Sequence, residues 1–258
     1  MDIFKLNEFF KDIEKNFQKL SDEFFLKTLP DYIAGHLKEF TMLEVEGIEN
    51  IPSRGPALIV PNHSGVFGWD AVILNHEIYE KRRRIPRTMT HPFWEHSPLM
   101  KDVASRFGLF KRDLRHALRL LKHNNLILIF PEAERGNFKP SIKMYQLVDF
   151  ETGFVALAAM SGAPVIPVAI IGGEENYINL GTLDIFEKSL GFKIPLPLNL
   201  LPFRSKWKIK ILKPISFKKY GKKAIKNEKF LYEASQNIRF RIQATIHKEL
   251  VRKGIFKF

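Results

Sequence analysis

The sequence has 258 residues, of which 45% are hydrophobic and 27% charged, as is typical of a folded globular protein with one sizeable core or two small ones. The absence of cysteine excludes a disulfide framework and a thiolate metal site, and it fits a reducing cytosol. The formal net charge of +13 favours nucleic acid, anionic lipid or phosphorylated small molecules as partners, with a merely basic soluble surface as the alternative.

The beginning of the chain predicts an amphipathic helix. Its apolar residues recur at spacings of three and four, at Ile3, Leu6, Phe10, Ile13, Phe17 and Leu20. Such a helix packs either on its own domain or on a bilayer, and the neighbouring Phe4 and Phe9 widen the stripe in favour of lipid. Because no basic start precedes an apolar run, we expect no signal peptide.

Short apolar strands alternate with helices from about residue 41 onward. We predict strands at residues 42–46, 57–60, 126–130, 165–171 and 207–212, and helices at residues 69–79, 114–121, 154–160 and 231–250. The alternation predicts an α/β fold with a mostly parallel central sheet flanked by helices, preceded by N-terminal amphipathic helices. We expect residues 1–40 to be a helical segment that can dock on a membrane, and residues 41–258 to be the α/β domain.

Two apolar stretches need an interpretation other than a membrane span. Residues 153–173 carry no charge, but Pro164 and Pro167 divide them into a small-residue helix and a buried strand, so we expect no transmembrane helix. Residues 190–203 are rich in leucine and interrupted by proline. We interpret them as a segment that contacts a membrane interface or an acyl chain, with burial on the domain as the alternative.

Basic residues gather in three clusters, at residues 81–87, 111–115 and 218–223. Such runs usually form a solvated face, and they also fit a nucleic-acid-binding module. Tyr220 is the one aromatic residue within these clusters, and the sequence carries no recognisable nucleic-acid motif. We therefore expect a membrane surface with anionic phospholipid as the partner, and no nucleic acid.

Two predicted strands end in turns that are rich in polar side chains. The first turn lies in residues 60–70, with the sequence VPNHSGVFGWD, and the second lies in residues 129–136, with the sequence IFPEAERG. Ligands of open α/β sheets bind beyond the carboxyl ends of the strands. Both turns are therefore candidate parts of one site.

His63 and Asp70 in the first turn have the chemistry of a general base and its orienting carboxylate, although a structural role for the pair stays an alternative. Ser64 is adjacent, but no Gly-x-Ser-x-Gly elbow occurs, so the nucleophile can be a hydroxyl of the substrate itself. The residues His63, Asp70 and His76 lack the spacing of known short metal motifs, and we expect no metal site.

Four sequence blocks in order resemble those of the glycerolipid acyltransferases, the family of 1-acylglycerol-3-phosphate acyltransferases. The blocks are Asn62-His63 with Asp70, Gly108-Leu109-Phe110-Lys111-Arg112, Phe130-Pro131-Glu132 with Arg135, and Val165-Ile166-Pro167-Val168. A run at residues 46–52 is also typical of the family. Each block alone is unspecific, whereas four in the family's order make a specific resemblance.

The resemblance implies a mechanism and a set of roles. His63 would take the proton of an acceptor hydroxyl while Asp70 holds the ring, and the hydroxyl would attack an acyl thioester directly. Glu132 would contact acceptor hydroxyls, and Arg112 and Arg135 would hold a phosphate of the acceptor, since a guanidinium binds phosphate in a forked way. The remaining substrate-binding residues would be Asn62, Gly108, Lys111 and Pro131.

The same resemblance implies 1-acylglycerol-3-phosphate or a similar lysophospholipid as acceptor. It implies acyl-CoA or an acyl carrier protein thioester as co-substrate, without any other cofactor. The enzyme would be peripheral, on the cytoplasmic face of the membrane.

The sequence departs from the family pattern at two places. Six residues separate His63 from Asp70 where the family has four. In one continuous helix that spacing would put the two backbones about 10 Å apart, so we expect Gly65 and Gly68 to fold the loop back. Ala133 replaces the usual glycine and can narrow the acceptor site. The odd spacing leaves open a catalytically inactive, lipid-binding relative.

Overall fold

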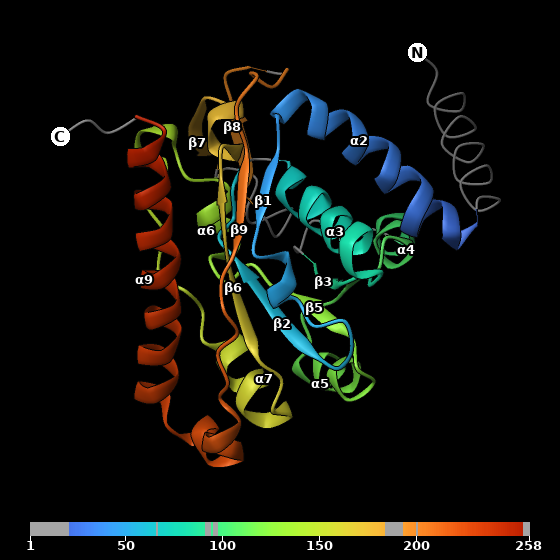
Figure 1. The fold of residues 1–258 in the computed structure, drawn as a ribbon, viewed down its shortest axis with the longest axis vertical. Helices are drawn as coiled ribbons and strands as arrows, with labels where there is room; N and C mark the ends of the chain where they lie inside the picture. The colour runs from blue at the N-terminus through green and yellow to red at the C-terminus, as the bar shows by residue number, and fades with distance from the viewer. Residues whose placement is uncertain are drawn as a thin grey trace.

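Seven strands form the central sheet of the computed structural model, which describes residues 21–65, 67–90, 94, 98–183, 193–199 and 201–254. The strands are β1 (Glu44–Glu46), β2 (Ala57–Pro61), β3 (Arg87–Met89), β4 (Leu109–Phe110), β5 (Leu126–Leu128), β6 (Val165–Ile171) and β9 (Lys208–Ile211). Their order across the sheet is β1-β9-β6-β2-β5-β3-β4 (Figure 1). The five strands from β6 to β4 are parallel, β9 is antiparallel to β6, and β1 is parallel to β9.

Helices cover both faces of this sheet, which confirms the predicted fold class. The helices are α2 (Leu29–Thr41), α3 (Trp69–Arg82), α4 (Pro98–Arg106), α5 (Leu114–Lys122), α6 (Ala133–Asn137), α7 (Gly153–Ser161) and α9 (Glu228–Arg252). Shorter helical turns are η1 (Phe24–Thr28), η2 (Ile48–Asn50), η4 (Ser141–Lys143), η5 (Gly173–Asn176) and η6 (Lys218–Lys226). Helices α2 and α3 lie on the face opposite to α7 and α9 (Figure 1).

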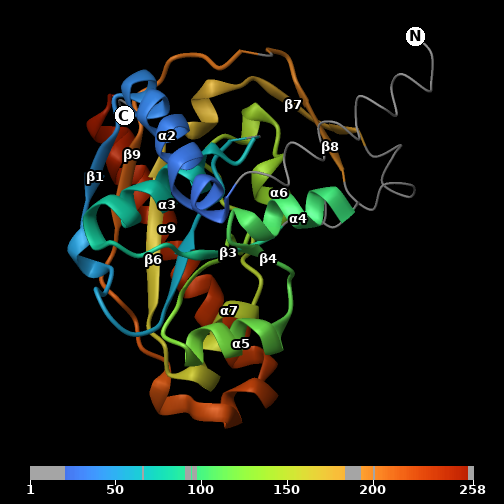
Figure 2. The ribbon, with the colours of Figure 1, turned by 90° about the vertical axis from the view of Figure 1, so that its right-hand side faces the viewer.

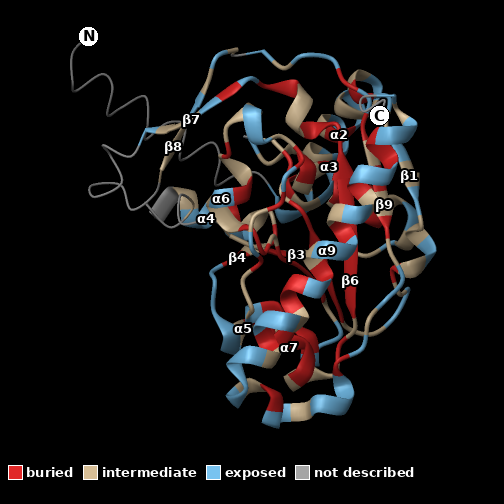
Figure 3. Ribbon diagram, turned by 90° about the vertical axis from the view of Figure 1, so that its left-hand side faces the viewer, coloured by how far each residue is buried: buried red, intermediate tan, exposed pale blue. Residues whose placement is uncertain are grey.

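Alternation along the buried strands separates two cores. In β2, Leu58 and Val60 pack with α5, α7 and α9, whereas Ala57 and Ile59 pack with α3. Both faces of β2 and β6 are therefore apolar, which is why these strands have continuous apolar sequences. Figure 3 shows β6 buried along its length and α9 buried on one side only.

Polar residues at helix ends explain where two predicted helices begin. The carboxylate of Asp113 accepts hydrogen bonds from the backbone N–H groups of Arg115 (2.6 Å) and His116 (3.1 Å) at the start of α5. Asn227 accepts one from Phe230 N–H (2.9 Å) at the start of α9. Each bond satisfies an N–H group that has no partner inside the helix.

The predicted amphipathic stripe of residues 3–20 lies outside the described residues. The helix that follows, α2, packs on α3 through Leu37 and through two ion pairs. His76 Nε2 lies 2.8 Å from Asp31 Oδ1, and Lys38 Nζ lies 2.6 Å from Glu77 Oε1. Helix α2 therefore belongs to the packed fold.

A second, two-stranded antiparallel sheet stands apart from the central one (Figure 2). It consists of β7 (Asn179–Leu183) and β8 (Ile194–Pro197). Within the predicted interfacial segment, Leu196, Leu198, Leu201 and Phe203 are all exposed. Their exposure contradicts burial on the domain for the described part of this segment.

Within the described ranges, no helix combines the length and the apolar character needed to cross a membrane.

Candidate active site

The two polar turns lie next to each other because they follow adjacent parallel strands. Strand β2 pairs with β5 in the register Ala57↔Leu126, Leu58↔Ile127 and Ile59↔Leu128, so the carboxyl ends of both strands reach the same edge of the sheet. The backbone N–H of His63 donates to Glu132 Oε1 over 3.0 Å and joins the two turns directly. This edge is where open α/β sheets place their ligands.

The structure brings His63 and Asp70 into contact despite their spacing. His63 Nδ1 lies 2.7 Å from Asp70 Oδ2. Helix α3 begins only at Trp69, and the loop before it turns back at Gly65 (φ 101°) and Gly68 (φ 72°), where glycine has no side-chain penalty. The distance expected for a continuous helix does not apply because most of the intervening residues form a loop.

Three hydrogen bonds hold the Asp70 carboxylate, which is fully buried. Besides the His63 ring, the backbone N–H groups of Ser64 (2.7 Å) and Ala71 (2.8 Å) donate to it. Its place in the first turn of α3 adds the favourable field of the helix N-terminus. Asp70 is therefore fixed in position as an acceptor for the imidazole.

The orientation of the His63 ring follows from its two contacts. Asp70 accepts from Nδ1, so the proton of the neutral ring resides on Nδ1 and the lone pair on Nε2. The ring stacks on Phe130, with centroids 4.2 Å apart and 25° between planes. Among the described residues, no hydrogen bond is made to Nε2, and the side chain is 15% exposed. Nε2 is free to accept a proton from a bound molecule.

Glu132, a predicted acceptor contact, is engaged with the backbone and fully buried. Its Oε1 accepts from His63 N–H, and its Oε2 accepts from Val148 N–H over 3.0 Å. Burial raises the pKa of Glu132, and the Lys139 ammonium, 4.0 Å away, opposes that rise. The carboxylate fixes both turns to the segment around residue 148.

Asn62, another predicted substrate ligand, is likewise engaged. Its Nδ2 donates to Ile170 O (3.0 Å) and its Oδ1 accepts from Ile170 N–H (2.7 Å), with the side chain fully buried. These two bonds fasten the end of β2 to β6. They fix the backbone immediately before His63 relative to the sheet.

The two arginines predicted to hold phosphate meet one acidic segment, residues 149–151. Arg112 forms a two-pronged ion pair with Glu151, with Nη1–Oε1 3.3 Å and Nη2–Oε2 2.5 Å. Arg135 Nη2 donates to the backbone carbonyl of Asp149 over 3.1 Å. The segment is itself tied to the second turn, since Glu151 N–H donates to Pro131 O over 2.9 Å. Both guanidinium groups thus contact this one segment.

The other predicted binding residues have different surroundings. Lys111 is exposed. Gly108 has φ 73°, and a side chain there would come within 3.1 Å of Arg87, so its role is to turn the chain into β4. Ala133 adopts φ 53°, the left-handed region that glycine favours. Ala133 therefore has a backbone conformation that a glycine would adopt without strain.

An apolar cavity of ≈ 250 Å³ opens beside the Arg112–Glu151 pair. Its lining includes the apolar residues Met89, Leu114, Ile129, Pro131, Phe154 and Leu157. The cavity lies between the second turn and helices α5 and α7. An apolar cavity with a few polar groups at one place is typical of a site for a small lipid-like ligand.

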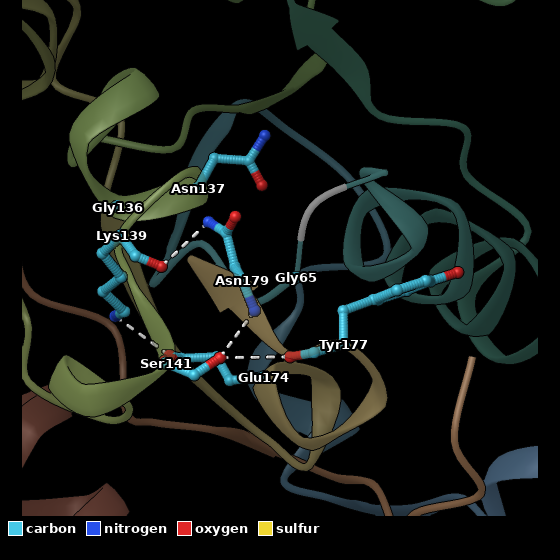
Figure 4. Close-up of a pocket in the computed structure, with 8 residues that line it drawn as sticks. All are labelled: Gly65, Gly136, Asn137, Lys139, Ser141, Glu174, Tyr177 and Asn179. Atoms are coloured by element: carbon cyan, nitrogen blue, oxygen red, sulfur yellow. Dashed lines mark hydrogen bonds and ion pairs between the residues drawn. The ribbon is translucent and has the colours of Figure 1, made fainter. Parts of the chain in front are cut away.

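A buried lysine behind the turns is a feature that the sequence analysis missed. Lys139 Nζ lies 3.0 Å from Glu174 Oε1, and burial raises the pKa of Glu174. A small polar cavity of ≈ 20 Å³ lies between them and Gly65 (Figure 4). Glu174 follows the carboxyl end of β6, so the rule that selected the first two turns could have found it.

One cluster away from this edge has the composition of a metal site. Asp31, His76 and Glu80 each offer a ligand atom within 4.8 Å of the others. The cluster joins α2 to α3, and the neighbouring carboxylate of Glu77, 3.6 Å from Nδ1, raises the pKa of His76. An ion-paired clamp between two helices accounts for these contacts.

Comparison with known proteins gives matches over most of the chain. Residues 42–171 match the acyltransferase family. An uncharacterized protein of Mycobacterium tuberculosis (strain ATCC 25618 / H37Rv) is 31% identical over 232 residues, which are 85% of this chain and 65% of the relative. The chain therefore spans 65% of the length of that relative.

Two characterised proteins are also similar. The 1-acyl-sn-glycerol-3-phosphate acyltransferase of Pseudomonas aeruginosa is 30% identical over 137 residues, covering 51% of this chain and 50% of its own. The crystal structure of the 1-acyl-sn-glycerophosphate acyltransferase PlsC from Thermotoga maritima superposes with a TM-score of 0.55 at 18% identity, covering 86% of this chain and 81% of that one. This likeness extends the fold comparison to nearly the whole chain.

Proposed function

The chain belongs to the acyltransferase family, and from this premise we propose that it moves a fatty-acyl group from an acyl thioester onto a hydroxyl of a lipid. The observation that carries the proposal is the His63–Asp70 pair at the carboxyl ends of the strands, in which Nε2 has no hydrogen bond to any residue that the structure describes. The apolar cavity beside the same turns supports a fatty-acyl substrate. Such a chain is bound through burial of its methylene groups.

The reaction proceeds by general base catalysis. His63 Nε2 takes the proton of the acceptor hydroxyl as its oxygen attacks the thioester carbonyl, and the imidazolium is stabilised by Asp70. When the tetrahedral intermediate collapses, the carbon–sulfur bond breaks and the departing thiolate receives that proton. An ester and a free thiol result, and the enzyme returns to its starting state.

The proposed acceptor is a lysophospholipid, with 1-acylglycerol-3-phosphate as the first candidate. The names of the two characterised relatives support it, as does the convergence of Arg112 and Arg135 on one segment. A phosphate between them would have to draw Arg112 away from Glu151. Acyl-CoA or an acyl carrier protein thioester would be the donor, and no other cofactor is needed for this chemistry.

The proposed location is the cytoplasmic face of a membrane, as a peripheral protein. A fatty-acyl acceptor resides in a bilayer, and a net charge of +13 favours anionic phospholipid over a neutral surface.

The test is an acyl-transfer assay with a labelled acyl-CoA and a panel of lysolipids, with and without phosphate. His63→Ala should lower turnover about 100- to 10,000-fold, because a positioned base contributes that much. His123→Ala is the matched control, since His123 is an exposed histidine whose ring Nδ1 lies 2.8 Å from the carbonyl oxygen of Arg119, within its own helix end. Circular dichroism checks the fold of both. Near wild-type transfer by His63→Ala would contradict the mechanism.

A further inference from the structure

Exposed apolar side chains are concentrated on the small sheet. Among the described residues, sixteen large hydrophobic side chains are exposed, and seven of them lie between residues 178 and 203. Here the name apolar ribbon denotes six of these, Leu180, Leu183, Leu196, Leu198, Leu201 and Phe203, on β7, on β8 and on the irregular segment that follows β8. Single exposed apolar residues are ordinary, but a contiguous group marks an interaction surface.

The base of the ribbon is fixed by polar side chains rather than by burial of its leucines. Asn179 donates to the carbonyls of Phe138 (2.9 Å) and Lys139 (3.1 Å). Asn199 accepts from Ile178 N–H (2.8 Å) and donates to Asn176 O (3.0 Å). These hydrogen bonds hold the ribbon in place while Leu198 and Leu201 stay 66% and 82% exposed. The backbone of the ribbon is thus held by hydrogen bonds, while its apolar side chains lie outside the core.

The ribbon begins next to the catalytic loop. Tyr177, just before β7, packs edge-on against Phe67, with ring centroids 5.0 Å apart. Phe67 is itself 51% exposed and lies in the loop between His63 and Asp70. Gly65 of the same loop and Tyr177 line one small cavity (Figure 4). The buried ring of Tyr177 therefore links the start of the ribbon to the loop that carries the base.

The charges on the described residues of the ribbon and its flanks have one sign. In the described parts of residues 176–206, the charged side chains are Lys193, Arg204 and Lys206, and none is acidic. Arg204 and Lys206 are exposed, as is Lys143 in the η4 turn, which contacts β7. An apolar surface with a cationic rim complements an anionic phospholipid bilayer, because the apolar part enters the acyl region and the rim meets the headgroups.

We propose that the apolar ribbon inserts into the interface of an anionic phospholipid bilayer and thereby sets the His63 loop against the leaflet. The proposal rests on the proposed function, because a lipid acceptor must reach His63 from a membrane. It assigns docking to a surface within the α/β domain, separate from the N-terminal stripe.

The chain contains no cysteine, so a single introduced cysteine can carry a probe. Leu198→Cys, labelled with the environment-sensitive fluorophore NBD, should show a blue-shifted and stronger emission when vesicles of phosphatidylcholine and phosphatidylglycerol are added. Val251→Cys is the control, since Val251 is 55% exposed on α9. Its emission should not change. An unchanged spectrum for the Leu198 probe on vesicles that sediment with the protein would overturn the proposal.

A double variant tests the contribution to binding. Leu198→Asp with Leu201→Asp should weaken co-sedimentation with the same vesicles about 10- to 100-fold, as loss of two inserted leucines predicts. The control is Phe240→Asp with Val251→Asp on α9, which should bind like wild type. Equal binding by both double variants would overturn the proposal. The proposal would also be overturned if the protein were a dimer in solution and the emission of the Leu198 probe were blue-shifted without vesicles. The ribbon would then bind a second copy of the chain.

The two proposals fail separately. The probe and the sedimentation assay report docking without turnover, so a chain that docks through the ribbon but transfers no acyl group contradicts the proposed function alone. If the ribbon variant keeps its turnover on a water-soluble short-chain acceptor, the catalytic site of that variant is intact. Transfer by a chain whose Leu198 probe never responds contradicts the docking proposal alone.

Discussion

Replacing Glu151 by Gln removes one negative charge and keeps the size of the side chain. In the structure Glu151 holds Arg112 by two bonds. If Arg112 binds the phosphate of an acceptor, that phosphate competes with Glu151 for the same guanidinium. Glu151→Gln should therefore raise kcat/KM for 1-acylglycerol-3-phosphate and leave kcat/KM for a monoacylglycerol unchanged.

The size of the effect follows from the exposure of the pair. The side chains of Arg112 and Glu151 are 64% and 36% exposed, so water and salt screen the attraction. Ion pairs of this kind contribute about 0.2 to 1 kcal/mol. Since 1.36 kcal/mol is a factor of ten in rate, the gain should be about 1.5- to 5-fold. Arg112→Ala should act in the opposite direction, with a loss of about 10- to 100-fold on the phosphorylated acceptor.

The assay compares initial rates on both acceptors at low substrate concentration, in one buffer of fixed ionic strength. Glu233→Gln is the matched control, because Glu233 is an exposed glutamate on α9 that faces Lys229. A fall in kcat/KM on the phosphorylated acceptor would refute the competition and show that Glu151 positions Arg112 for binding. Parallel changes on both acceptors would show that neither residue contacts a phosphate.

Three further changes test the site and its support. Asp70→Asn should lower kcat on the order of 10,000-fold with an intact fold, because the imidazole then adopts the wrong tautomer. An unchanged kcat in a folded variant would refute the role of the His63–Asp70 pair. Lys139→Met leaves two buried carboxylates without their cation and should destabilise the fold by about 3 to 5 kcal/mol, measured by urea unfolding. Burial already raises the pKa of Glu132 and of Glu174. An acid with a raised pKa binds protons more tightly when folded, so stability is present at low pH and falls as the pH rises through that pKa. The penalty of Lys139→Met should accordingly be smaller at pH 5 than at pH 8, and a penalty independent of pH would exclude the charge argument. Ala133→Gly should raise the free energy of unfolding by about 1 kcal/mol, since it relieves a left-handed backbone at an L-residue, and a lower melting temperature would contradict this.

The central strands could be predicted from sequence because a strand that is buried on both faces has consecutive apolar residues. The apolar runs at residues 57–60, 126–130 and 165–171 are β2, β5 and β6, three neighbours in the sheet. Strands β3 and β4 have only three and two residues, too few to form a recognisable apolar run. They exist through pairing with β5 and with each other, which a local pattern cannot reveal.

The pairing of His63 with Asp70 shows a similar limit. Residue types and order predicted the two partners, but their distance depends on where α3 begins and on two positive φ angles in the loop. A count of intervening residues carries no information about either. The partners of Arg112 and Lys139 lie 39 and 35 residues away in sequence, so their ion pairs were beyond prediction from a motif.

The structure also separates residues that can meet a substrate from those that hold the site together. Asn62 and Glu132 have both of their polar atoms on backbone groups, and both are fully buried. Glu132 already accepts hydrogen bonds from the N–H groups of His63 and Val148. An acceptor hydroxyl that replaced one of these N–H groups would break a bond that holds the backbone of His63, and this would move the catalytic imidazole. His63 Nε2 makes no hydrogen bond within the described chain, and the guanidinium of Arg112 is largely exposed. Acceptor specificity is therefore better sought at Arg112 and Glu151 than at the residues that support the base.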